Sequence, residues 1–175
     1  MSEQHPVGVI GAGSFGTAVA NLLAENNAVY LYSRRQDYVA EMQNTRMSAG
    51  QKLHEQVIPT HDIAHVARQC YVLFPIVSSD GFKDTIRTMA PFLRPDHILI
   101  HGTKGLALKK KGLEKLKEKS RIAGKNVLTM SQLIRRESVV VRIGCLAGPN
   151  LAREIASGFP AATVIASRFD EVIQE

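Results

Sequence analysis

The stretch VGVIGAGSFGTAVANLLAENNAVYLYSRR, residues 7–35, decides the fold. It opens with a short apolar run over residues 7–11, which predicts a buried strand. Residues 14–25 place apolar side chains at helical spacing, and Ser14 is a candidate N-cap. Residues 28–33 combine aromatic and β-branched side chains and predict a second strand. The stretch therefore predicts a strand–helix–strand unit with a tight, glycine-rich turn before the helix.

The turn carries three glycines, Gly11, Gly13 and Gly16, that fit the pattern G-x-G-x-x-G. The pattern is weak alone, but its place between a strand and an amphipathic helix makes it specific. Gly11 allows the tight turn, Gly13 lets a pyrophosphate approach the main chain, and Gly16 lets the helix pack on the strand. The N–H groups of Ser14, Phe15 and Gly16 then face the phosphates at the positive end of the helix dipole. A turn that needs glycine only for packing is the alternative.

The second predicted strand ends in basic residues, Ser33-Arg34-Arg35, where a dinucleotide site that prefers NAD usually carries an acid. Two guanidinium groups suit a ribose 2′-phosphate, which they can clamp bidentately. One of them could also stack on the adenine face. We therefore expect NADP to bind at least as well as NAD. Solvated loop arginines without a ligand are the alternative.

The rest of the chain alternates between apolar runs and amphipathic segments, with residues 45–56 polar and loop-like. The strands that it predicts are 70–77, 97–103, 138–148 and 162–167, and the helices are 36–44, 62–68 with Asp62 as its cap, 80–90, 109–119, 129–136 and 150–157. This alternation predicts the α/β class, as a Rossmann-type doubly wound, mostly parallel sheet with helices on both faces. The last residues predict the start of a new helix, so we expect residues 1–175 to be the first domain of a longer protein.

The composition fits a soluble, cytoplasmic domain. Of the 175 residues, 45% are hydrophobic and 22% are charged, and the net charge is +6. A basic balance suggests an anionic partner. Two isolated cysteines, Cys70 and Cys145, make neither a zinc site nor a disulfide framework. The basic residues are not interleaved with stacking aromatic residues, which argues against nucleic acid, and no segment resembles a signal or membrane anchor.

Two further segments carry candidate chemistry. HGTKGL, residues 101–106, follows a predicted parallel strand, so Lys104 would reach the cleft where ligands bind in such sheets. An ammonium there would stabilise negative charge developing on a carbonyl oxygen during its reduction. In LAGPNLAREIASG, residues 146–158, Gly148 forms a turn and Asn150 is the expected N-cap of a helix whose start could bind a substrate. A surface lysine and ordinary capping are the alternatives.

The segments GAGSFGTAVA, TKGL and GPNLAREIASGFPAATVIAS, in this order and spacing, resemble the N-terminal domain of NAD(P)-dependent glycerol-3-phosphate dehydrogenase. The resemblance covers essentially the whole chain. It implies hydride transfer that reduces dihydroxyacetone phosphate to sn-glycerol 3-phosphate, a precursor of glycerophospholipids. The residues that it assigns are Ser14, Phe15, Arg34, Arg35 and Ala152 to the cofactor, Lys104 to both cofactor and substrate, and Gly148 and Asn150 to the substrate.

The sequence also departs from the family pattern. Asn150 stands where Ser or Thr is usual, Leu151 replaces Phe, and Ser78 and Ser79 lie in a divergent stretch expected to edge the cleft. The family's helical C-terminal domain, which carries a second lysine as general acid/base and an Arg-Asn pair for the substrate phosphate, does not follow. We expect the chain alone to bind cofactor and to be nearly inactive. A dehydrogenase for 3-hydroxy acids or 6-phosphogluconate, a stand-alone NADP-binding module and a homodimer of the complete enzyme stay open.

Overall fold

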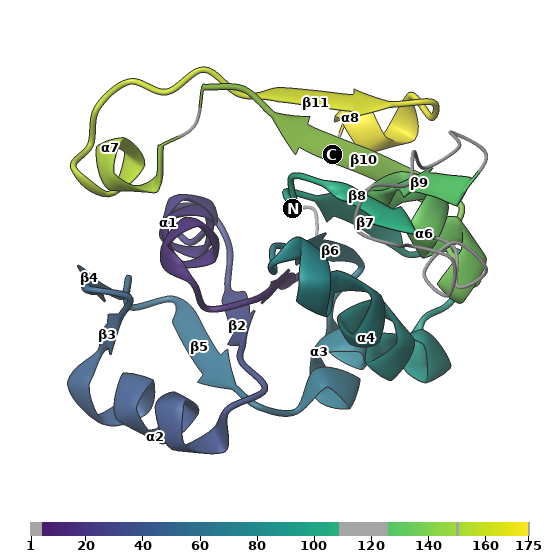
Figure 1. Cartoon of the computed structure of the whole chain (residues 1–175). Coiled ribbons are helices and arrows are strands. Elements are labelled where there is room, and N and C mark those ends of the chain that lie inside the picture. Colours follow the sequence, from purple (N-terminus) through teal and green to yellow (C-terminus); the bar gives the residue numbers. More distant parts are fainter. Residues whose placement is uncertain (1–4, 109–125, 150, 175) are drawn as a thin grey trace, which may run out of the picture.

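A mostly parallel sheet forms the centre of the structure, a computed structural model that describes residues 5–108, 126–149 and 151–174 (Figure 1). Seven strands lie in the order β11-β10-β7-β6-β1-β2-β5. Their bounds are β1 Val7–Ile10, β2 Val29–Tyr32, β5 Val57–Thr60, β6 Val72–Pro75, β7 Ile98–His101, β10 Arg142–Ala147 and β11 Val164–Ser167. Each neighbouring pair is parallel except β10 and β11. The predicted Rossmann-type class is confirmed.

Helices cover both faces of this sheet (Figure 1). Their bounds are α1 Ser14–Leu23, α2 Gln36–Thr45, α3 Ile63–Gln69, α4 Ser79–Met89, the 3₁₀ turn η1 Ala90–Phe92, α6 Met130–Glu137, α7 Ala152–Ala156 and α8 Glu171–Gln174. Two small hairpins complete the fold, one from β3 Met47–Ser48 and β4 Gln51–Lys52, the other from β8 Leu106–Leu108 and β9 Val127–Thr129. Within the described ranges, no helix is long and apolar enough to cross a membrane.

The core consists of two apolar layers, because side chains alternate between the faces of a strand. In β1, Ile10 packs with α3, α4 and α6, whereas Val9 packs with α1 and α2 on the other face. Both side chains are fully buried. Such burial on both faces explains why the central strands read as continuous apolar runs.

Several elements differ from the sequence-based prediction. The strand β5 was not predicted, because a four-residue run containing Pro59 looks unlike a strand; it lies at the sheet edge, where a missing N–H is tolerated. The range 45–56, predicted to be a loop, contains the β3–β4 hairpin. The strand predicted from residue 138 begins only at Arg142. The predicted helix over 109–119 lies outside the described residues.

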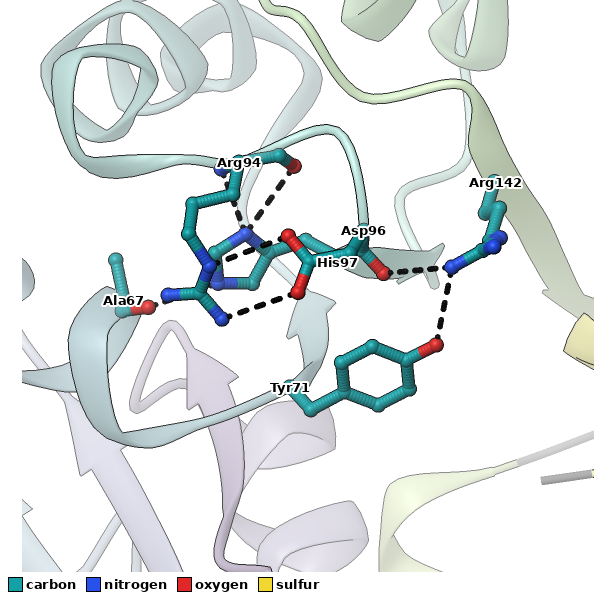
Figure 2. A network of polar contacts seen from close by, with 6 residues as sticks. All are labelled: Ala67, Tyr71, Arg94, Asp96, His97 and Arg142. Atoms are coloured by element: carbon teal, nitrogen blue, oxygen red, sulfur yellow. Dashed lines mark hydrogen bonds and ion pairs between the residues drawn. The ribbon is translucent and has the colours of Figure 1, made fainter.

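A polar network ties the amino ends of β7 and β10 to α3 (Figure 2). Because these strands run parallel to β1, the network lies at the end of the sheet opposite the β1–α1 turn. His97 is fully buried; its Nδ1 accepts from the main-chain N–H of Arg94 at 2.7 Å, and its Nε2 donates to the carbonyl of Ala67 at 2.8 Å. Arg142 donates to the Tyr71 hydroxyl and to the Asp96 carbonyl, each at 3.1 Å. Because its buried polar atoms are paired, this network serves the fold.

Candidate functional site

A cleft of about 650 Å³ opens at the carboxyl ends of β1, β2, β6 and β7. Strands β1 and β6 are neighbours, and the chain moves outward from them in opposite directions, so the cleft lies at the topological switch point of the sheet. Its lining residues are Gly11, Ala12, Gly13, Phe15, Gly16, Tyr32, Ser33, Arg34, Arg35, Tyr38, Ile63, Ile76, Val77, Ser78, Ser79, Gly81, Asp84, Thr85, Thr88, Gly102, Thr103 and Lys104. Seven of the eleven residues predicted to bind cofactor or substrate meet here: Gly11, Gly13, Phe15, Gly16, Arg34, Arg35 and Lys104.

The three glycines of the turn meet different constraints. Gly11 has a φ of +123°, and a Cβ there would collide with the main-chain oxygen of Ile76. A Cβ on Gly16 would collide with the main-chain oxygen of Gly11. Gly13, in contrast, is exposed, and a Cβ there would meet nothing within 4 Å. Packing therefore accounts for two of the glycines, while the bare main chain at Gly13 is open to a ligand.

The helix α1 begins directly at this turn. Its N-cap is Gly13, with φ −81° and ψ 178° and no capping side chain. The prediction that Ser14 is the N-cap is wrong, because Gly13 takes the extended conformation of an N-cap and Ser14 is the first helical residue. The first hydrogen bond runs from the Thr17 N–H to the Gly13 carbonyl at 2.8 Å. The N–H groups of residues 14–16 therefore lack helical acceptors and stand at the positive end of the dipole.

The β3–β4 hairpin braces the start of α1 from outside the cleft. The hydroxyls of Thr17 and Ser48 are 2.8 Å apart, and both side chains are buried. The side-chain amide of Gln51 donates to the Ser14 carbonyl at 2.9 Å. Sequence reasoning missed this brace, because the polar segment reads as a loop until the hairpin brings it against α1.

The basic end of the cleft follows β2. Both Arg34 and Arg35 are exposed and line it beside Tyr38. The Arg35 guanidinium contacts the Asp37 carboxylate at 2.9 Å and lies 5.3 Å from the centroid of the Tyr38 ring. Burial raises the pKa of the Tyr32 phenol, and the positive charge of Arg34 partly opposes that shift. This end of the cleft is therefore suited to an anionic group.

Lys104 stands on the loop after β7, at the mouth of the cleft, with an exposed side chain. The preceding residue, Thr103, is buried and fixes the loop: its hydroxyl donates to the Val77 carbonyl at 2.8 Å and accepts from the Val77 N–H at 3.3 Å. These bonds tie the loops after β6 and β7 together. The aromatic ring of Phe15 lies close above Gly102, where a Cβ would approach it to 3.1 Å. Lys104 thus projects from a well-supported loop.

One wall of the cleft comes from α4. Ser78 caps this helix by accepting from the Gly81 N–H at 3.4 Å, and Ser79 follows it, as expected for residues at the cleft edge. Further along the helix, Asp84, Thr85 and Thr88 line the cleft, opposite the apolar side that Phe82 and others bury in the core. Sequence reasoning missed these three; their helical spacing would have indicated the shared face, but not what it faces.

Four predicted site residues are not placed in the cleft. Ser14, Gly148 and Ala152 are absent from its lining, and Asn150 lies outside the described residues. Gly148 follows β10 with a φ of +138°, and Ala152 begins α7, which lies beside α1 (Figure 1). The N-cap of α7 is Leu151, not the predicted Asn150. The assigned roles of these four residues stay predictions.

Comparison with known proteins identifies the family. The family model described as the N-terminus of NAD-dependent glycerol-3-phosphate dehydrogenase matches residues 6–173. Among curated relatives, the glycerol-3-phosphate dehydrogenase (NAD(P)+) of Pseudomonas putida is 37% identical over 180 residues, covering 100% of this chain and 48% of that protein. That of Saccharophagus degradans is 34% identical over 179 residues, covering 99% of this chain and 46% of that protein. The chain thus spans about half the length of these relatives.

The solved structures agree with this assignment. A crystal structure of glycerol-3-phosphate dehydrogenase from Coxiella burnetii superposes with a TM-score of 0.80 at 27% identity, over 98% of this chain and 49% of that one. The matched region carries the glycine turn, the cleft and the loop of Lys104 described above. On these grounds the chain belongs to the family of NAD-dependent glycerol-3-phosphate dehydrogenase N-terminal domains.

Proposed function

We propose that this chain is the NAD(P)-binding part of an oxidoreductase that interconverts dihydroxyacetone phosphate and sn-glycerol 3-phosphate. One observation carries the proposal: the bare main chain at Gly13 and the unpaired start of α1 open into the same cleft as Lys104. The names of the curated relatives support the substrate, and residues 1–175 correspond to about half of those proteins.

The residues present fit a nicotinamide dinucleotide. Gly13 offers space that no protein atom fills, and the N–H groups of residues 14–16 would donate to the diphosphate. Arg34 and Arg35 would lie near the adenosine ribose and favour a 2′-phosphate, so we propose that NADP binds at least as well as NAD. When bound, the cofactor supplies the hydride.

Lys104 is the group that we assign to the reacting carbonyl. Reduction of a ketone places negative charge on its oxygen, and a fixed ammonium stabilises that charge more in the transition state than in the ground state. The Thr103 hydroxyl, bonded to both main-chain polar groups of Val77, would keep the lysine at the mouth of the cleft. By the family resemblance, the proton donor and the groups that bind the substrate phosphate would come from a helical C-terminal domain.

The test uses the complete reading frame that contains residues 1–175. Oxidation of NADPH is followed with dihydroxyacetone phosphate and, for comparison, with 3-keto acids, and reduction of NADP is followed with 6-phosphogluconate. We expect turnover of dihydroxyacetone phosphate alone, and a Lys104→Ala loss of about 10²- to 10³-fold in kcat. Lys52→Ala, which removes an exposed lysine outside the cleft, is the matched control. Turnover of another substrate would contradict the proposal, as would cofactor binding without turnover.

The remaining proposals concern the cell and the assembly. Both Cys70 and Cys145 are free thiols, which suits a reducing compartment such as the cytoplasm. A homodimer of the complete enzyme stays a prediction, and light scattering on the purified complete protein would test it.

A further inference from the structure

The two arginines at the end of β2 differ in what they already contact. Arg35 forms a forked contact with Asp37: Nη2 is 2.9 Å from Oδ2, and Nε is 3.4 Å from Oδ1. Its guanidinium also lies 5.3 Å from the Tyr38 ring centroid. Arg34 lines the same cleft, and within residues 5–108, 126–149 and 151–174 its side chain has no hydrogen bond or ion pair. Only one of the two guanidinium groups is therefore uncommitted.

We propose that Asp37 is a specificity-determining residue that pairs with Arg35, competes with a ribose 2′-phosphate for its guanidinium, and so limits the preference for NADP over NAD. The inference rests on the proposed function, because it concerns the cofactor of that same cleft. Arg34 then serves as the primary cation for a 2′-phosphate, and Arg35 contributes only when it leaves Asp37.

The geometry supports this division of roles. Asp37 lies in the first turn of α2 and is not a lining residue, so it acts on the cleft through Arg35. The hydrogen bond from Arg35 lowers the pKa of the Asp37 carboxyl, which is therefore ionised at neutral pH. A 2′-phosphate carries about two negative charges and must compete with that carboxylate for the guanidinium. The neutral 2′-hydroxyl of NAD meets no such competition.

The chain provides a matched control for charge. Glu41 lies one helical turn after Asp37 on α2 and is also exposed. Its charge raises the pKa of Arg35, but less than the hydrogen bond and charge of Asp37 do. Removing Glu41 therefore changes the net charge of the helix without releasing Arg35.

The experiment measures Kd for NADP and NAD by titration calorimetry on the purified protein, with 2′,5′-ADP and 5′-AMP as fragment probes. In Asp37→Asn, we expect the ratio Kd(NAD)/Kd(NADP) to rise about 3- to 5-fold, the scale of an exposed ion pair, through tighter NADP binding alone. In Glu41→Gln the ratio should change by less than about 1.5-fold, because water and salt screen the more distant charge.

A double-mutant cycle separates release of Arg35 from simple loss of negative charge. In an Arg35→Gln background, Asp37→Asn should no longer change the ratio. An unchanged ratio in Asp37→Asn, a shift of equal size in Glu41→Gln, or a shift that persists without Arg35 each overturns the inference while leaving the proposed function intact. Failure of the unmodified protein to bind either cofactor overturns both.

Discussion

Replacing single glycines of the β1–α1 turn separates the residues that the fold needs from the one that a ligand needs. In Gly11→Ala, the new Cβ collides with the main-chain oxygen of Ile76, which cannot rotate away as a side-chain atom could. The alanine must also adopt the φ of +123°, which L-residues other than glycine rarely do. In Gly13→Ala, the new Cβ meets no protein atom within 4 Å, and the φ of −81° suits any L-residue. The two variants add the same methyl group two residues apart.

The expected free energies differ accordingly. For Gly11→Ala, backbone strain of about 1–3 kcal/mol adds to overpacking of a similar size, so unfolding should become easier by about 3 kcal/mol or more. For Gly13→Ala, the free energy of unfolding should change by less than about 1 kcal/mol. The methyl would displace a diphosphate from the N–H groups of α1, and the loss of one charge-assisted hydrogen bond, about 1.5–3 kcal/mol, weakens binding roughly 10- to 100-fold.

Urea denaturation gives the stability of both variants, and titration calorimetry gives their affinities for NADP and NAD. Gly13→Ala should lose affinity for both cofactors by the same factor, because the diphosphate is common to them. If Gly13→Ala binds as the unmodified protein does, no ligand approaches that main chain and the proposed function loses its central support. If it unfolds as readily as Gly11→Ala, the assignment of open space at Gly13 is wrong.

Three further predictions concern buried and paired side chains. Burial lowers the pKa of His101 below its usual 6.5, so near this pH the folded state binds fewer protons than the unfolded state does. The free energy of unfolding should therefore fall as the pH drops below about 6.5, and it should fall less in His101→Gln. Urea denaturation at pH 5.5 and 7.5 measures both. Burial raises the pKa of the Cys70 thiol to about 12, so in a Cys145→Ala variant a thiol reagent at pH 8 should label Cys70 only as fast as the protein unfolds. Glu137 on α6 accepts a 2.6 Å hydrogen bond from Arg87 on α4, so Glu137→Gln should lower the free energy of unfolding by about 1 kcal/mol, whereas Thr88→Ser, next to Arg87 on α4, should change it little; urea denaturation measures both.

The parts of the fold and site that the sequence predicts are those encoded locally. The run of residues 7–10, the glycines and the apolar spacing of α1 are contiguous, so their pattern alone predicts strand, turn and helix. Asp62 caps α3 as predicted, by accepting from the His65 N–H at 2.8 Å, because an N-cap and its target are only three residues apart. The same local reasoning places the N-cap of α1 one residue late, at Ser14, because Gly13 already takes the extended conformation.

The missed parts depend on what the chain brings together over long distances. Nothing near Ser48 indicates that its hydroxyl will lie 2.8 Å from that of Thr17, 31 residues away. Thr85 and Thr88 are surface residues of a helix until α4 packs beside the switch point and turns them toward the cleft. Arg35 and Asp37 are close in sequence, but no periodic pattern at a helix start predicts whether Asp37 pairs with Arg34 or with Arg35.

Under the proposed function, the cleft recognises the two anionic parts of its cofactor by different physical means. The diphosphate would meet main-chain N–H groups at the start of α1, whose direction is fixed by the helix and whose first turn carries no acidic residue. A 2′-phosphate would meet Arg34 and Arg35, exposed side chains whose charge a neighbour such as Asp37 can offset. Substitution can therefore retune the choice between NADP and NAD at the end of β2 while the glycine turn, which binds what both share, stays unchanged. This separation explains how a rigid turn and an adjustable basic loop can coexist within one cleft.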